Sequence, residues 1–373
     1  MRWLHISRDT LASGMIKHAG ILSMAGAMML SSGTFGQSEM TRHLRSQIDK
    51  IIRFDTEIDL REIPGFIIGI VDGDSTYVLP YGIRQRSGDQ PLTPQDRFEI
   101  GGLTKVFSAM LMVELDAAAI LPLDTPVLDL LAPQWHTPSL TGITVRSLLN
   151  HTSGLPKYPP MFGDTQEAVQ NPYGHLDQAD LLASLKEVRS GDHGRFRYSH
   201  YNYALLEPIL TRLTGKAYGT LLARFVLSPL ALHATSIDTA GLAPGHDLSG
   251  RRAQPWTFAS FGPSEGLKSN LADLLRFVRY FLTLEEGAGV LQSDHDPVRV
   301  NKRLSMGLAW YLVDQRRAPR VHAHSGHTDG HYAFVAMVRQ TGTGVVVLAN
   351  SAAGVEDLGF LILRMINHNW RRK

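Results

Sequence analysis

Residues 98–107 read Phe-Glu-Ile-Gly-Gly-Leu-Thr-Lys-Val-Phe, and they begin a segment that we expect to be helical over residues 101–120. Near the start of a helix, residues three positions apart share one face. Position 102 and the amine of Lys105 should therefore lie side by side. A hydroxyl at position 102 could be activated by that amine, but this chain has Gly102 there, and a Gly-x-x-Lys pattern alone has no diagnostic value.

The segment before this helix predicts a β-hairpin. Pro64-Gly65 is followed by an apolar run at 66–71, an Asp-Gly-Asp turn signal at 72–74 and a second extended run at 76–81. The hairpin therefore supplies two strands from the N-terminal part of the chain.

The rest of the chain alternates between helical and extended patterns. The predicted segments are a helix near 44–52, a helix at 272–284, extended runs at 306–313, 333–339 and 345–349, and a final helix at 355–370. A long, mostly helical middle separates the two groups of strands. This order predicts an α+β fold with an antiparallel sheet that is built from both chain ends and flanked by helices, plus a mainly helical insertion.

The order of these segments resembles the serine β-lactamase-related family, which includes class C β-lactamases, D-alanyl-D-alanine carboxypeptidases and related esterases. The resemblance is carried by Pro64-Gly65 with the hairpin and by residues 98–107, 123–127, 148–156, 196–201, 266–277, 307–310 and 324–326. Of these, Leu-Leu-Asn-His-Thr-Ser-Gly-Leu-Pro at 148–156 is quite specific. The likeness covers roughly residues 40–370 in a consistent order, which makes the fold inference strong.

The resemblance implies a fold like that of β-lactamases and penicillin-binding-protein transpeptidases. Residues 40–373 would form the β-lactamase-related domain. Its α/β part would comprise about 40–105 and 300–373, and its helical part about 106–299.

The resemblance also implies roles for particular residues. Lys105 would assist proton transfer, and Tyr198 would be the general base, with its pKa lowered by nearby cationic groups. His324 would shape the cationic or hydrogen-bonding side of the pocket. Backbone N–H groups near position 102 and near His327 would form an oxyanion hole. The substrate-binding positions would be His200, Ser325, Gly326 and His327.

Two positions depart from the family pattern. Gly102 stands where the family has its nucleophilic serine, so no covalent acyl-enzyme can form there. His200 replaces an asparagine that orients the substrate amide and the lysine in the family. The neighbouring hydroxyls of Thr104 and Ser108 do not have the required position, because successive helical residues turn by about 100°.

The glycine at position 102 has two explanations. It could be an engineered change that traps a complex in an otherwise active hydrolase. It could instead be natural, giving a pseudoenzyme or a site with altered chemistry, and the presence of leader residues favours this version. We therefore expect impaired acyl transfer on D-amino-acid peptides, β-lactams or small esters. The alternative is a non-catalytic binding protein for peptidoglycan-type peptides or a partner.

Five residues near the C-terminal strands suggest a third, metal-dependent activity. They are His322, His324, His327, Asp329 and His331. Zinc sites use such ligands, but no helical pair of the His-Glu-x-x-His kind supports a metal here, and we expect no cofactor. His151 is better interpreted as a structural hydrogen-bonding residue beneath the site than as a base.

Composition limits the partners and the location. The chain has 37 basic and 35 acidic residues, a net charge of +2, and no cysteine. This balance gives no electrostatic reason to expect nucleic acid, so the expected partner is a small-molecule or peptide substrate. The oligomeric state is not indicated.

The N-terminus predicts export. A short basic start at 15–18 precedes an apolar stretch at 19–30 and small residues at 31–36, with cleavage expected after Gly36 and an upstream extension at 1–14. The alternative is an uncleaved membrane anchor. After signal removal we expect a periplasmic or secreted protein that does not bind the membrane.

Overall fold

The computed structural model describes residues 39–58, 63–86, 88–163, 171–189, 191–316 and 318–367. The expected export signal and the last basic residues, 371–373, lie outside these ranges. The chain divides into two compact units, Met1–Leu44 and Arg45–Lys373, and the sheet and the site both belong to the second. Within the described residues, no helix is long and apolar enough to cross a membrane.

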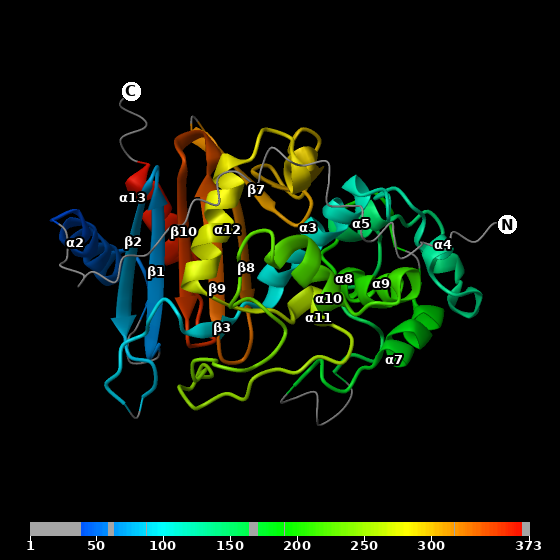
Figure 1. Cartoon of the computed structure of the whole chain (residues 1–373), viewed down its shortest axis with the longest axis horizontal. Coiled ribbons are helices and arrows are strands. Elements are labelled where there is room, and N and C mark those ends of the chain that lie inside the picture. Colours follow the sequence, from blue (N-terminus) through cyan, green and yellow to red (C-terminus); the bar gives the residue numbers. More distant parts are fainter. Residues whose placement is uncertain are drawn as a thin grey trace. The chain divides into compact units, whose positions relative to one another are not determined.

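The main feature of the second unit is an antiparallel sheet, which the described residues form with eight strands in the order β2-β1-β10-β9-β8-β7-β6-β5 (Figure 1). The strands are β1 (Gly65–Asp72), β2 (Ser75–Gly82), β5 (Val298–Arg299), β6 (Leu304–Met306), β7 (Tyr311–Gln315), β8 (Ala318–His327), β9 (Tyr332–Val338) and β10 (Thr343–Ala349). β1 pairs with β2 and with β10, so the two chain ends meet in the sheet as predicted. A second, small sheet pairs β3 (Arg97–Glu99) with β4 (Lys268–Asn270).

Helices and short helical turns fill most of the chain between the two groups of strands. The longer helices are α2 (Glu39–Phe54), α3 (Thr104–Ala117), α9 (Leu206–Thr214), α12 (Leu271–Thr283) and α13 (Glu356–Ile366). The shorter ones are α4 (Val127–Leu130), α5 (Val145–Leu149), α7 (Gln178–Ala183), α8 (His200–Ala204), α10 (Tyr218–Leu222) and α11 (Gly262–Glu265). Short 3-10 helices are η1 (Gly101–Leu103), η2 (Pro133–Trp135), η3 (Pro138–Leu140), η4 (Ser184–Glu187), η6 (Gly289–Asp294) and η7 (Arg339–Thr341), and η5 (Ala223–Leu227) is a short π-helix.

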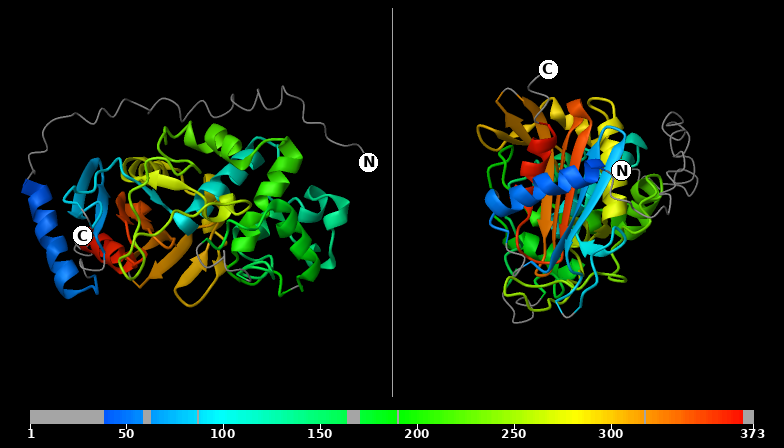
Figure 2. Two further views of the ribbon diagram at one scale, coloured as in Figure 1. Left: turned by 90° about the horizontal axis from the view of Figure 1, so that it is seen from below. Right: turned by 90° about the vertical axis from the view of Figure 1, so that its left-hand side faces the viewer.

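The green helices α7–α10 gather beyond the orange strands, on the side of the sheet away from β1 and β2 (Figure 2). The predicted fold class, an antiparallel sheet flanked by helices with a mainly helical insertion, is confirmed.

Two sequence predictions need correction at their boundaries. The extended run predicted at 306–313 is two strands, because a turn with Ala309 at φ 66° separates β6 from β7 and is closed by a 2.8 Å hydrogen bond from Gly307 N to Trp310 O. The final helix ends at Ile366 rather than at 370. Asn367 ends it, and its Nδ2 donates to Leu363 O at 2.8 Å.

Helices cover both faces of the sheet. A Cβ on Gly344 would meet Val278 of α12, whereas a Cβ on Gly359 of α13 would meet Phe334 of β9. In the β10–β9 register Gly344 lies opposite Met337, three residues from Phe334. Side chains alternate between faces along a strand, so Met337 and Phe334 point to opposite faces, and α12 and α13 lie on opposite sides of the sheet.

The helix α3 lies in the core and carries Lys105. Its side chains from Thr104 to Val113 are all buried, which is typical of a helix surrounded by protein on every side. Phe107 stacks on Phe277 of α12 with ring centroids 4.2 Å apart, and Phe277 also contacts Phe281. The position of Lys105 therefore depends on packing between α3 and the helix that covers the sheet.

We predict that Phe277→Ala destabilises the protein by about 3–5 kcal/mol, because it removes a fully buried ring and leaves a cavity between α3 and α12. Urea unfolding followed by circular dichroism would measure the change. Arg276→Ala on the same helix is the control and should cost less than about 1 kcal/mol, since its ion pair with Asp273 is partly exposed. Equal losses in the two variants would contradict the prediction.

Candidate active site

The site is built where β8 runs directly against η1. A Cβ on Gly326 would lie 2.0 Å from Ile100 O and 2.4 Å from Gly102 N, so only a glycine permits this approach. A Cβ on Gly101, which has φ 45°, would lie 2.7 Å from His327 N. The two backbones are therefore in contact, and Ser325 O is brought to 3.3 Å from where a Cβ at position 102 would lie.

Backbone hydrogen bonding leaves one edge of His327 free of β9. Thr328 N donates to His331 O at 2.9 Å, and hydrogen-bonded pairs alternate along an antiparallel ladder. The neighbouring pair, His327 and Tyr332, is therefore a non-hydrogen-bonded pair. The N–H of His327 is consequently directed away from β9. Together with its closeness to Gly101, this is the geometry of an oxyanion-type donor.

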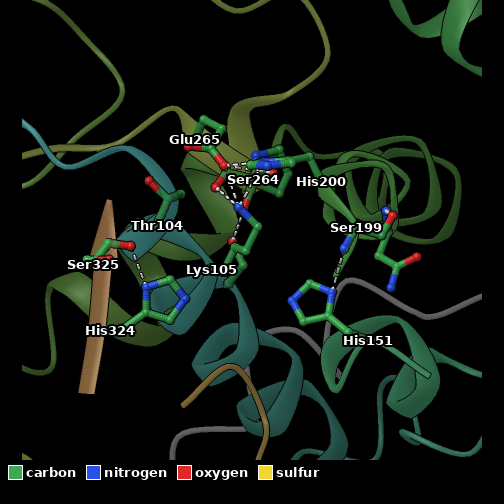
Figure 3. A network of polar contacts seen from close by, with 12 residues as sticks. Thr104, Lys105, His151, Ser199, His200, Ser264, Glu265, His324 and Ser325 are labelled. Atoms are coloured by element: carbon green, nitrogen blue, oxygen red, sulfur yellow. Dashed lines mark hydrogen bonds and ion pairs between the residues drawn. The ribbon is translucent and has the colours of Figure 1, made fainter. Parts of the chain in front are cut away.

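Lys105 is fully buried and lies at the centre of a polar network (Figure 3). Its Nζ forms an ion pair with Glu265, which is 3% exposed, and donates to Ser264 O at 3.1 Å. It also lies 3.3 Å from His200 Nδ1. Burial lowers the pKa of Lys105, and the charge of Glu265 opposes that shift.

Tyr198 and Lys105 converge on position 102. A Cβ added to Gly102 would lie 3.3 Å from Ser325 O, 3.4 Å from Tyr198 Oη and 3.6 Å from Lys105 Nζ. These are the three polar groups that would surround a serine side chain there.

The protonation state expected for Tyr198 was wrong. Burial raises its pKa well above 10, and the negative charge of Glu265 raises it further. The expectation assumed an unopposed ammonium beside the phenol, whereas the lysine charge is paired with a buried carboxylate. Tyr198 is therefore a neutral phenol, a proton donor in the resting site.

His200 occupies the place of the expected asparagine and is held on two sides. Its Nδ1 lies 2.6 Å from Glu265 Oε1, and its ring stacks on that of Tyr158 at 4.7 Å. Burial, helped by the charge of Lys105, lowers the pKa of His200 to about 4. The imidazole is therefore neutral near pH 7, and with Nδ1 protonated it donates to Glu265.

Of the two roles expected for His324, cationic or hydrogen-bonding, its surroundings favour the second. It is buried on β8, and its Nδ1 donates to Ser325 O at 2.7 Å. Burial and the charge of Lys105 lower its pKa to about 3, so the ring is neutral.

His151 lies beneath Tyr198 and acts as a structural support. Its Nδ1 accepts a 3.1 Å hydrogen bond from Ser199 N, and its ring centroid lies 4.5 Å from that of Tyr198. Burial lowers the pKa of His151 well below 6.5, so it is a neutral acceptor that positions the loop before α8.

The metal hypothesis for the histidine cluster is not supported, because its members face different partners. His322 Nε2 contacts Asp294 at 2.5 Å, whereas His331 contacts Glu99 at 3.3 Å and Ala243 O at 3.0 Å. Among the described residues, which include the whole cluster, no group of three or more His, Cys, Asp or Glu side chains could hold a metal ion.

The two neighbouring hydroxyls are engaged away from position 102. Thr104 Oγ1 accepts from Leu267 N at 3.1 Å, and Ser108 Oγ donates to Pro263 O at 2.6 Å. Neither replaces the missing serine.

Sequence reasoning missed Glu265. It precedes the Gly-Leu pair at 266–267 that contributed to the resemblance, but nothing in the local pattern marks it. Its partner Lys105 is 160 residues away in the chain. A buried carboxylate is costly unless it is paired, and only the fold reveals the pairing.

The chain belongs to the family described as "Beta-lactamase", whose model matches residues 54–366. Penicillin-binding protein 4* of Bacillus subtilis (strain 168) is 23% identical over 81% of this chain and 71% of its own length. Protein flp of Staphylococcus aureus (strain N315) is 24% identical over 84% of this chain, which spans 64% of that protein.

Solved structures show the same fold. A class C β-lactamase superposes with a TM-score of 0.74 at 20% identity, covering 89% of this chain and 98% of that one. A structure titled β-lactamase/D-alanine carboxypeptidase from Pseudomonas syringae gives 0.72 at 19% identity, covering 87% of this chain and 99% of that one.

We predict that Gly326→Ala strongly destabilises the protein, because its methyl group would collide with the backbone of η1 and force β8 away. Thermal unfolding should show a large drop in Tm. Gly88→Ala is the control, because its Cβ would meet no atom closer than 3.5 Å and the change should have little effect. An unchanged Tm for Gly326→Ala would contradict the close contact.

We also predict a pH-dependent contribution of Glu265 to stability. Burial alone would raise its pKa, but Lys105 and His200 outweigh that effect and lower the pKa from 4.5 to about 2. A depressed carboxyl pKa stabilises the fold above pH 4.5, and this stabilisation is lost as the pH falls toward 2.

The difference in unfolding free energy between the wild type and Glu265→Gln should therefore shrink between pH 5 and pH 3. Urea unfolding at several pH values measures it. Asp192→Asn, which removes an exposed ion pair with Arg195, is the control. A difference that is independent of pH would contradict the assigned charge.

Proposed function

We propose that this site binds carbonyl groups of D-amino-acid peptides, β-lactams or small esters, and that it forms no acyl-enzyme at position 102. The single observation that supports this is the arrangement of Lys105 Nζ, Tyr198 Oη and Ser325 O around the empty side-chain position of Gly102. Membership of the β-lactamase family supports the choice of substrate class. Because Gly102 has no hydroxyl, we expect no acylation at this position.

Retention of the buried network supports a bound carbonyl ligand rather than a decayed site. A buried ion pair is weak evidence for stability, since apolar residues of similar volume often replace it without loss. In this chain Lys105 nevertheless pairs with Glu265, and its Nζ lies 3.6 Å from where a Cβ on Gly102 would be. A binding protein without turnover is the second candidate, because the same groups would also orient a ligand.

We further propose that the mature protein acts outside the cytoplasm. The support is the basic and apolar pattern at residues 15–36 together with the family's association with cell-wall peptides and their analogues. Fractionation of the producing cells would test it.

We predict that fluorescent penicillin does not label the wild type covalently, whereas Gly102→Ser becomes labelled. The restored hydroxyl would lie beside Lys105 and Tyr198, and the position can accept a side chain because its nearest contacts are 3.3–3.6 Å. Gel fluorescence and intact-mass spectrometry measure the adduct.

Two variants control this experiment. Gly102→Ala adds a methyl group without a hydroxyl and should stay unlabelled, and Ser108→Ala excludes the other nearby hydroxyl. Labelling of the wild type would contradict the proposal. A folded but unlabelled Gly102→Ser variant would show that the groups around position 102 do not suit acylation.

A further inference from the structure

The missing side chain leaves a small polar space at position 102. Its surroundings are a carbonyl oxygen, a phenol and an amine, all within 3.6 Å of where a Cβ would be. An ordered water needs two to four polar partners, and Ser325 O, Tyr198 Oη and Lys105 Nζ provide three. A water at this place would lie in the space that a serine side chain at position 102 would fill, next to the same proton-transfer groups.

We propose that a water molecule takes the place of the serine hydroxyl and attacks the substrate carbonyl directly, so that the protein is a hydrolase that works without an acyl-enzyme. The inference rests on the proposed function, since the carbonyl must first bind beside Gly102. The substrate class is an ester or a strained amide, whose carbonyl carbon water can attack.

The chemical step uses groups that are already in place. The reactive form is the one in which the Lys105 ammonium has first lost a proton to solvent, a loss that burial favours and Glu265 opposes. The water oxygen then forms a bond to the carbonyl carbon while its proton passes to the amine of Lys105, and the carbonyl electron pair moves to the oxygen beside the N–H of His327. The bond to the leaving group then breaks. Tyr198 gives its proton to that group and regains one from the Lys105 ammonium. The products are a carboxylic acid and an alcohol or amine, and the site returns to its starting state.

Glu265 is a positioning residue in this scheme. It contacts Lys105 and His200 but does not reach the reacting atoms, and its charge stabilises the ammonium over the amine. The other titratable groups around Lys105 are His200 and Tyr203 on α8, Tyr198 before it, Tyr158 and His151 after α5, and His324 on β8. Apart from Glu265 these are histidines with lowered pKa values and tyrosines with raised ones, so Glu265 is the main charge that opposes the burial of Lys105.

The decisive comparison is between the wild type and Gly102→Ala. Neither has a nucleophilic side chain at position 102, but the methyl group of the alanine variant occupies the space for the water. Gly102 is not among the residues with positive φ, so its backbone accepts alanine. With p-nitrophenyl acetate and a chromogenic cephalosporin, we expect the wild type to turn over and the alanine variant to lose about 100-fold in rate. Intact-mass spectra should show no adduct in either.

A second variant tests the proton path without filling the space. Glu265→Gln removes the charge that favours the ammonium, so the rising limb of the pH–rate profile should move to lower pH. A residue with a purely structural role would lower the rate without moving this limb. Circular dichroism confirms that each variant is folded.

Ligand binding is measured separately, by calorimetry with an acyl-D-alanyl-D-alanine peptide. Binding with turnover that falls in Gly102→Ala supports the inference. Binding without turnover, or equal turnover in Gly102→Ala, overturns the inference and leaves the proposed function standing. Absence of both binding and turnover overturns the proposed function and the inference with it. A covalent adduct in the wild type overturns the water mechanism.

Discussion

The contact between the backbone of β8 and the backbone of η1 is the constraint on which the site depends. Gly326 and Gly101 have no side chains, and this allows the two segments to lie against each other without an intervening layer. As a result Ser325 O and the N–H of His327 come from the sheet, whereas Gly102 and Lys105 come from the buried helix. Because β8 and η1 are in direct contact, groups from the sheet and groups from the helical region face the same site.

The electrostatics of the site follow from one buried ion pair. Lys105 and Glu265 are both almost free of solvent, so each is costly without the other. Burial, together with the charge of Lys105, lowers the pKa values of His200 and His324 and leaves both neutral, whereas burial and the charge of Glu265 raise the pKa of Tyr198 and keep it protonated. The site therefore has little net charge, and its directional groups are hydrogen-bond donors and acceptors held at fixed positions. Such groups can act on a polar carbonyl without first reorganising.

The sequence predicts the fold well, because period-two and helical patterns locate most elements and the order of short motifs determines how they connect. The hairpin of β1 and β2, the C-terminal strands and α12 lie where the pattern puts them. The turn at 307–310 was missed because both of its flanks are apolar. At the site, motif positions brought Gly102, Lys105, Tyr198 and Ser325 together. The charge states could not be derived, since they depend on Glu265, which meets Lys105 only through the packing of α11 against α3 and α8.

The space at position 102 also bears on which side chains the fold can accept there. The groups that surround it would meet a new Cβ at ordinary distances, apart from Ser325 O, which must give by a few tenths of an ångström. The junction, the lysine and the phenol therefore still surround position 102 with the groups that a serine there would contact. The folded structure would therefore still accept a serine side chain at position 102.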